Sequence, residues 1–195
     1  MDHIETLDDL LALYGAPGIG ATIKVRRALI PSYRTFIERS RFCILSTVGP
    51  EGTDGTPRGD EAQVVTVLDD RTLAMPDWTG NERVDNLRNI IRDGRVSLLF
   101  LIAGSKDAIR VNGTARLTTD DGLRSRYARN GQLPRLVVVI RIAEVYSQCP
   151  KALNRAALWS GDASADLPTP ADSFAEIKSG AFDALPATAI WPDWV

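Results

Sequence analysis

Histidine is almost absent from this chain, since its 195 residues include only one, His3. That scarcity argues against a Ser-His-Asp or Cys-His catalytic group and against a metal site built from several histidines. Cysteine is scarce too, because Cys43 and Cys149 are the only two and lie far apart in the sequence. They predict free thiols in a reducing compartment. If the chain is an enzyme, we expect a bound cofactor to supply its reactivity.

The chain also lacks an apolar run of membrane-spanning length. Its first residues, "MDHIETLDDLLALYG", have neither the cationic start nor the cleavage site of a secretory signal. The formal net charge is only -2, so no broad basic surface is expected to attract nucleic acid or an anionic membrane. We therefore predict a cytoplasmic protein whose partners include neither nucleic acid nor a membrane.

Hydrophobic residues make up 44% of the chain and charged residues 25%, which is typical of a single globular domain. Beyond Trp159 the composition turns to Gly, Asp, Pro and Ser. We expect residues 1–160 to form one domain that begins with helices, and residues 161–195 to form a peripheral tail.

Short runs rich in β-branched residues, separated by Gly, Pro and Asp, predict strands over most of the domain. We expect these strands at residues 42–48, 62–68, 72–75, 95–102, 108–117 and 135–147. Only residues 80–93 could form a helical crossover between parallel strands. The fold class is therefore mainly β (α+β), an antiparallel barrel with peripheral helices rather than a doubly wound sheet.

The Asn112-Gly113 pair within "AIRVNGTARL" poses a choice, because Asn-Gly is a strong hairpin signal. A two-residue turn there would mix polar and apolar side chains on one face of the hairpin. The apolar residues instead keep one phase straight through Gly113. We therefore predict a single strand.

Residues 80–93 read as a helix with an unusual polar start. Thr79 and Glu82 have the spacing of a capping box, which predicts that the helix begins at Gly80. Free backbone N–H groups at such a start, together with Gly80, Asn81 and Arg83, suit a phosphate. A capped surface helix with solvated charges explains the same residues. The predicted buried face consists of Val84, Leu87, Ile90 and Ile91.

Two further segments carry candidate binding residues. Residues 49–62 read as a glycine-rich loop in which Arg58, Gly59 and Asp60 stand at the entrance of the next strand, where a side chain could reach a ligand. A plain hairpin loop is the alternative. In the helix expected after Pro150, Lys151 and Arg155 lie four residues apart on one face and form a basic rim.

The order of these motifs resembles a known family. The stretches "ILSTVGPEGTDGTPRGD", "LAMPDWTGNERVDNLRNIIRDGRVSLLFLI" and "IRVNGTARL" are similar to the pyridoxamine 5'-phosphate oxidase-like flavoproteins, which have an FMN-binding split barrel. The segment "SQCPKALNRAALW" is similar to one uncharacterised branch of the group. The likeness covers about residues 36–159.

The resemblance implies FMN as the cofactor and a homodimer that holds it at the subunit interface. Asn81 and Arg83 match the family's phosphate cluster, and Arg58, Gly59 and Asp60 match its arginine-bearing strand. The remaining implied cofactor contacts are Val64, Asp77, Gly80, Lys151 and Arg155. The backbone of residues 64–66 would tune the flavin ring, and the tail would pack on the domain or on its dimer partner.

The chain also departs from the family pattern. Pyridoxamine-phosphate oxidases end with an arginine and histidine pair that grips the substrate, whereas this chain ends "ATAIWPDWV". The expected function is therefore an FMN-dependent oxidoreductase that transfers electrons or hydride to or from an unidentified small organic substrate. No side chain is expected to act as a catalytic acid or base. A non-catalytic flavin-binding sensor or storage protein and a deazaflavin-dependent reductase are the alternatives.

Overall fold

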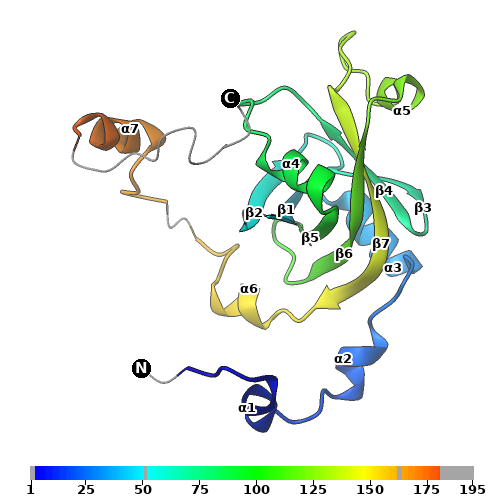
Figure 1. The fold of residues 1–195 in the computed structure, drawn as a ribbon, viewed down its shortest axis with the longest axis vertical. Coiled ribbons are helices and arrows are strands. Elements are labelled where there is room, and N and C mark those ends of the chain that lie inside the picture. The colour runs from blue at the N-terminus through cyan, green and yellow to red at the C-terminus, as the bar shows by residue number, and fades with distance from the viewer. Residues whose placement is uncertain (1–2, 51, 162–163, 181–195) are drawn as a thin grey trace. The chain divides into compact units, whose positions relative to one another are not determined.

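The computed structural model describes residues 3–50, 52–161 and 164–180 (Figure 1). The chain divides into two units, Met1–Trp159 and Ser160–Val195, and each is treated by itself. In the first unit the elements follow in the order α1 (Leu7–Ala12), α2 (Ile19–Ile23), α3 (Pro31–Arg39), β1 (Phe42–Gly49), β2 (Gly52–Gly59), β3 (Thr66–Asp69), β4 (Thr72–Asp77), α4 (Asp85–Arg92), β5 (Arg95–Leu101), β6 (Ala108–Thr118), α5 (Asp121–Ser125), β7 (Leu136–Gln148) and α6 (Lys151–Arg155).

The seven strands form one sheet in the order β2-β1-β5-β6-β7-β4-β3. Every neighbouring pair is antiparallel, so the predicted antiparallel, mainly β fold class is confirmed. In a flat sheet, five strand spacings would separate β2 from β4 by roughly 24 Å. Arg58 on β2 and Asp77 on β4 are instead joined at 2.7 Å. The sheet therefore curls until a side chain of β2, at one end, reaches β4, next to the other end, while the strand order stays open, as in a split barrel.

Strand β2 was predicted to be a loop, and that prediction is wrong. All eight of its residues pair with β1, from Gly52 opposite Gly49 to Gly59 opposite Phe42. Its sequence, GTDGTPRG, lacks apolar alternation because β2 is an edge strand with little buried surface. Pro57 fits such a strand, since an edge position leaves a backbone N–H without a ladder partner in any case.

Strand β6 runs unbroken through Asn112 and Gly113, as predicted. A bulge lies on the neighbouring strand instead: Asn112 pairs with Glu144, Gly113 pairs with Ile142, and Ala143 is left without a partner. The bulge brings β7 close to Gly113. A β-carbon there would lie 2.0 Å from the carbonyl oxygen of Arg141, so only glycine fits.

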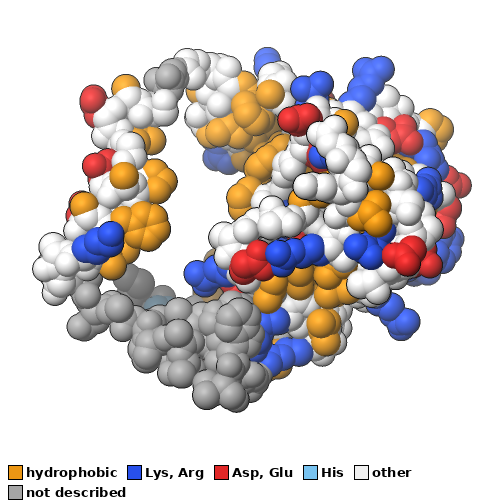
Figure 2. Space-filling view, turned by 90° about the horizontal axis from the view of Figure 1, so that it is seen from above, with side chains coloured by type: hydrophobic (Ala, Val, Ile, Leu, Met, Phe, Trp, Pro, Cys, Tyr) orange, Lys and Arg blue, Asp and Glu red, His pale blue; other side chains and the backbone are white. Residues whose placement is uncertain are grey.

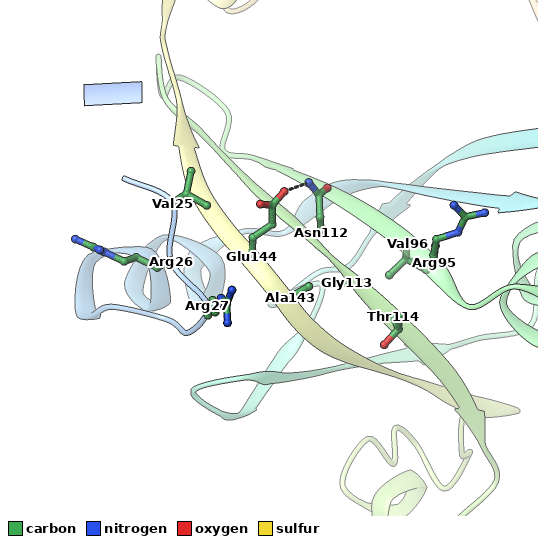
Figure 3. A pocket seen from close by; sticks show the side chains of 10 residues that line it. All are labelled: Val25, Arg26, Arg27, Arg95, Val96, Asn112, Gly113, Thr114, Ala143 and Glu144. Carbon is green, nitrogen blue, oxygen red and sulfur yellow. Dashed lines mark hydrogen bonds between the residues drawn. The ribbon is translucent and has the colours of Figure 1, made fainter. Parts of the chain in front are cut away.

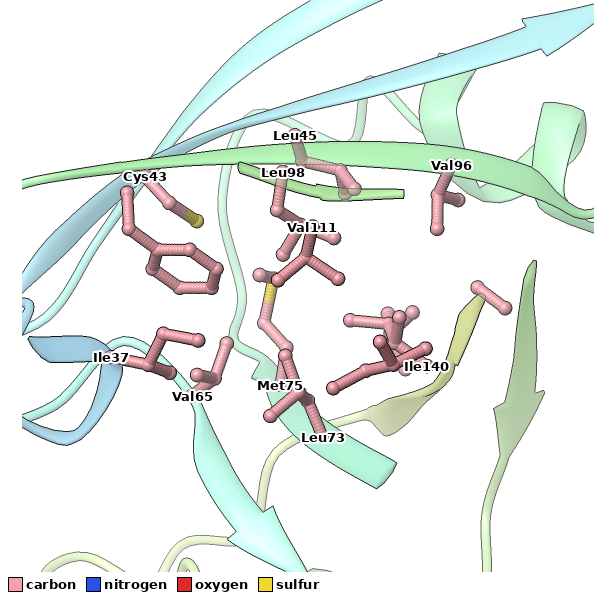
Figure 4. Close-up of a cluster of buried hydrophobic side chains, with 14 of the residues drawn as sticks. Ile37, Cys43, Leu45, Val65, Leu73, Met75, Val96, Leu98, Val111 and Ile140 are labelled. Carbon is pink, nitrogen blue, oxygen red and sulfur yellow. The ribbon is translucent and has the colours of Figure 1, made fainter. Parts of the chain in front are cut away.

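The core lies inside the curled sheet (Figure 4). Alternate residues of the strands point inward, as the two-residue period of a strand requires. Leu45, Leu73, Leu98, Val111 and Ile140 come from five different strands, and none of them is exposed. From outside the sheet, helix α3 adds the buried Tyr33 and Ile37.

Helix α4 is rotated relative to its predicted orientation. Ile91, which was expected to be buried, is 75% exposed, whereas Asn86 is only 4% exposed. The Nδ2 atom of Asn86 donates to Thr47 Oγ1 at 2.9 Å, and Asn89 Nδ2 donates to the same oxygen at 3.1 Å. Because the buried hydroxyl of Thr47 needs polar partners, the asparagine edge of the helix faces β1.

The N-terminal helices contribute nothing to this core, because α1 and α2 have no buried residues. On the face that Figure 2 shows, basic and acidic side chains are interspersed rather than segregated. Within the described ranges no helix is long and apolar enough to cross a membrane.

The second unit contains helix α7 (Pro170–Lys178), whose start is fixed by a capping box between Thr169 and Asp172. Residues 181–195, including the terminal "ATAIWPDWV", lie outside the described residues. The domain boundary at residue 160 and the packing of the tail on the domain or on a dimer partner therefore stay predictions.

Gly113→Ala is expected to lower the free energy of unfolding by about 1–3 kcal/mol, because the added methyl overpacks the bulge against backbone. Gly55→Ala is the matched control, since its β-carbon would meet nothing closer than 3.8 Å. Urea denaturation followed by circular dichroism measures both variants. Equal stability of the two variants would show that the close approach of β7 does not restrict position 113 to glycine.

Burial raises the pKa of the Cys43 thiol to about 12, although the Arg58 guanidinium acts in the opposite direction. We therefore expect Ellman's reagent at pH 8 to modify one thiol per native chain, the exposed Cys149, and two in denaturant. In this pH range only the unfolded chain would ionise the Cys43 thiol, and ionisation stabilises the unfolded state. The stability that the buried, neutral thiol contributes is therefore complete below a pH of about 8.5 and declines above it. Two rapidly reacting thiols in the native protein would contradict this assignment.

Candidate functional site

The segment between β4 and α4 is a loop rather than the start of a helix. Helix α4 begins at Asp85, and its N-cap residue, Val84, makes no side-chain capping bond. The predicted capping box of Thr79 and Glu82 is therefore wrong. Glu82 has a left-handed backbone conformation with φ of 63°, and its carboxylate binds Arg135 at the start of β7.

Arg58 and Asp77 form the ion pair that links β2, at one end of the sheet, to β4, next to the other end. Arg58 Nη1 lies 2.7 Å from Asp77 Oδ1, and the Asp77 side chain is only 13% exposed. Both residues were predicted to contact a cofactor. The structure brings them together, although they come from strands that are not neighbours in the sheet.

Three pockets of about 270, 200 and 230 Å³ meet at Arg58, which lines all of them. We call them together the Arg58 cleft. Eight of the ten predicted site residues line it, namely Arg58, Gly59, Asp60, Val64, Asp77, Gly80, Asn81 and Arg83. Residues scattered over two strands and two loops in the sequence therefore surround one cavity.

Two hydrogen-bond donors in this cleft are buried without an acceptor. Across the described residues, three buried side-chain polar atoms lack a partner, and two of them are Arg58 Nε and Trp78 Nε1. Both side chains line the same two pockets. Because burying an unpaired donor costs free energy, their presence together favours a ligand that supplies acceptor atoms.

Asp60 is a buried carboxylate that pairs with the half-exposed Arg129 at the edge of the cleft. Arg129 Nη2 lies 2.8 and 2.7 Å from the two carboxylate oxygens, and the Asp60 side chain is 5% exposed. The same guanidinium stacks over the Trp78 ring at 4.8 Å. Asp60 thus fixes Arg129 and Trp78, and its carboxylate is already occupied.

The other predicted residues of the cleft differ in which hydrogen-bonding groups and how much space they leave available to a ligand. Val64 lies just before β3, and its N–H donates to the carbonyl of Ser40 at 2.9 Å, so this donor is not available to a cofactor. Gly80 has open space where a β-carbon would stand. Asn81 Oδ1 accepts from the N–H of Arg83 at 3.0 Å, and Arg83 Nε donates to Asp85 Oδ2 at 2.5 Å.

Lys151 and Arg155 are not brought to the cleft. They lie at the two ends of the short helix α6 and line none of its three pockets. Within one chain their predicted contact with a cofactor has no geometric support. Contact across a dimer stays a prediction.

A separate and larger pocket, of about 650 Å³, lies over the bulge between β6 and β7 (Figure 3). At its centre Asn112 Nδ2 donates to Glu144 Oε1 at 2.7 Å. In the view of Figure 3, Arg26 and Arg27 line it on one side of this pair and Arg95 lines it on the other. The three arginines are therefore distributed around the pocket rather than gathered on one side of it.

Sequence reasoning missed Trp78 and Arg135, which line the cleft, and Arg129, which contacts the cleft residues Asp60 and Trp78. Trp78 stands directly beside "TGNER", and an aromatic residue at that place was a usable signal. Arg129 and Arg135 lie in the segment between α5 and β7, and no sequence motif marked either of them as a binding residue. Within the described part of the chain, no group of three or more His, Cys, Asp or Glu residues could hold a metal ion.

Comparison with known proteins agrees with this architecture. The family model described as pyridoxamine 5'-phosphate oxidase matches residues 29–149. A Lactobacillus delbrueckii protein proposed to be a pyridoxamine 5'-phosphate oxidase is 27% identical, with a TM-score of 0.50, over 62% of this chain and 95% of that one. HupZ from Group A Streptococcus is 17% identical, with a TM-score of 0.52, over 62% of this chain and 94% of its own.

No curated protein matches the chain. At 17% identity HupZ shows a shared fold and nothing further. The family model, by contrast, covers more than half of the residues, from the last turn before α3 to the end of β7. The chain therefore belongs to the pyridoxamine 5'-phosphate oxidase family.

Proposed function

We propose that the chain binds FMN in the Arg58 cleft and acts as a flavin-dependent oxidoreductase on a small organic substrate. The observation that carries this proposal is the pair of buried, unpaired donors, Arg58 Nε and Trp78 Nε1, within one cleft. A flavin is rich in carbonyl, ring-nitrogen and phosphate acceptors, so it would satisfy such donors. Bound flavin would supply the electron or hydride transfer, and the protein would supply position and electrostatics.

The pocket lined by Asn81, Arg83 and residues 54–58 suits the phosphate. Asp85 engages only the Nε of Arg83, so the two Nη groups of that guanidinium remain for phosphate oxygens. Asp54 and Asp85 also line this pocket and would by themselves repel the phosphate. The pairing of Asp85 with Arg83 offsets part of that repulsion and raises the pKa of the Arg83 guanidinium.

The pocket on the other side of Arg58 suits a flat aromatic ring. Pro57, Val64, Met75, Pro76 and Trp78 give it apolar walls, as is usual where a cofactor ring binds, and Arg58 and Asp60 give it a polar side. Val64 and Met75 are buried in the core, so this wall is rigid. Arg58 between the two pockets would face the linker and the polar edge of the ring.

We infer a homodimer with flavin at the subunit interface from the family to which the chain belongs. In such a dimer Lys151 and Arg155, which line no part of the cleft in their own chain, would be able to reach the partner's cofactor. The chain's own residues would bind and orient the flavin and shield its ring from water. No side chain of the cleft is assigned as an acid or base.

The protein purified from a flavin-containing host is expected to show the visible blue absorbance band of bound FMN. Stopped-flow mixing with NADH or NADPH should bleach that band, and air should restore it. A flavin that is bound but not reduced at a useful rate would favour the non-catalytic binder. A colourless protein that also fails to bind added FMN would contradict the proposal.

Replacement of Arg83 by alanine is expected to weaken FMN binding by about tenfold to a hundredfold, the worth of a charge-assisted hydrogen bond. Quenching of flavin fluorescence during titration measures the dissociation constant. Arg116→Ala is the control, because Arg116 is exposed on β6 and lines no pocket of the cleft. Equal affinity of the Arg83 variant and the control would remove Arg83 from the site.

A further inference from the structure

Glu82 combines an uncommon backbone conformation with a long-range ion pair. Its φ of 63° lies in the left-handed region, which residues other than glycine, asparagine and aspartate seldom adopt. Its carboxylate binds both terminal nitrogens of Arg135, a residue 53 positions away: Oε2 accepts from Nη1, and Oε1 accepts from Nη2 at 2.9 Å. Such strain persists only where the surroundings impose it, and it concentrates at functional sites.

Arg135 is a firm anchor for this ion pair. Its backbone N–H donates to the carbonyl of Asp77 at 2.9 Å, so it is fastened to the end of β4 where the loop of residues 78–84 departs. At the far end of the loop Val84 packs against the core, and its carbonyl accepts from the N–H of Arg88 at 2.9 Å. The Glu82–Arg135 pair therefore ties the middle of the loop to the barrel.

The neighbours of Glu82 are the two residues assigned to the phosphate. Asn81 and Arg83 line both the phosphate pocket and the adjoining pocket of the cleft, whereas Glu82 and Arg135 line only the latter. The left-handed turn at Glu82 thus sends its own side chain to Arg135 while the residues on either side face the phosphate pocket. Loss of the tie would let both of these residues move.

We propose that Glu82 and Arg135 are positioning residues, which hold the loop of residues 78–84 so that Asn81 and Arg83 grip the phosphate of a phosphorylated flavin. This inference rests on the proposed function and adds to it a means of distinguishing FMN from riboflavin. It differs from direct contact, because Arg135 acts through Glu82 and not on the ligand. If Arg135 itself bound the phosphate, removing Glu82 would free it and tighten FMN binding.

The test compares Glu82→Gln with the wild-type chain by titration with FMN and, separately, with riboflavin. We expect FMN affinity to fall about threefold to fivefold, the upper range for a well-formed exposed ion pair. Riboflavin has no phosphate, so its affinity should stay the same. Glu38→Gln, which removes the exposed ion pair of Glu38 with Arg34 at 3.3 Å, is the matched control and should change neither affinity.

Two variants and one ligand-free measurement complete the test. The double exchange Glu82→Arg with Arg135→Glu restores the ion pair and should recover part of the lost preference for FMN, which Arg135→Glu alone should not. Hydrogen exchange without flavin should be faster at residues 79–84 in Glu82→Gln and unchanged elsewhere. Tighter FMN binding by Glu82→Gln, or an equal loss of riboflavin affinity, would overturn the assignment.

These experiments distinguish a failure of the positioning role of the Glu82–Arg135 pair from a failure of the proposed function. A wild-type chain that binds no FMN contradicts the proposed function, whatever the variants do. In that case hydrogen exchange alone decides whether the ion pair holds the loop, and unchanged exchange in Glu82→Gln would overturn it. If Glu82→Gln binds FMN with the same affinity as the wild-type chain, the proposed function stands, but Glu82 does not position the phosphate-binding residues.

Discussion

The ion pair between Arg58 and Asp77 is the contact on which the candidate site depends. It joins β2 at one end of the sheet to β4 near the other, which is possible only because the sheet curls around its apolar interior. The same curl encloses Cys43, which faces the interior directly opposite Arg58 in the ladder. A largely buried charge pair needs further partners, and the unpaired Nε of Arg58 indicates that the protein alone does not supply all of them.

Around that ion pair, two arginines from a third loop hold the loop that contains Asp60 and the loop of residues 78–84. Arg129 binds Asp60 and stacks on Trp78, and Arg135 binds Glu82. Both arginines lie in the segment between α5 and β7, so this segment acts as a common support for the walls of the cleft. Helix α4 is fixed independently, through the hydrogen bonds of Asn86 and Asn89 to the buried hydroxyl of Thr47. Asn81 and Arg83, the residues proposed to face the phosphate, lie between these two supports.

Sequence patterns identified the strands that have one face in the core. In β1, β5, β6 and β7 the apolar residues alternate or run together because those strands line the interior. Strand β2 escaped detection because an edge strand buries little, and its glycines and proline mimic a loop. The orientation of α4 escaped detection for a different reason: Ile91 looked like a core residue, and nothing local revealed that Thr47 required Asn86.

The sequence by itself determined the fold class, the family and eight of the residues that line the cleft, because these follow from strand periods and from motifs that are local in the chain. Only the tertiary structure decided how those residues are paired. Arg58 and Asp77 are 19 positions apart, Glu82 and Arg135 are 53 apart, and Asp60 and Arg129 are 69 apart. No local signal encodes such pairs, because their partners meet only after the sheet has curled and brought its two ends together.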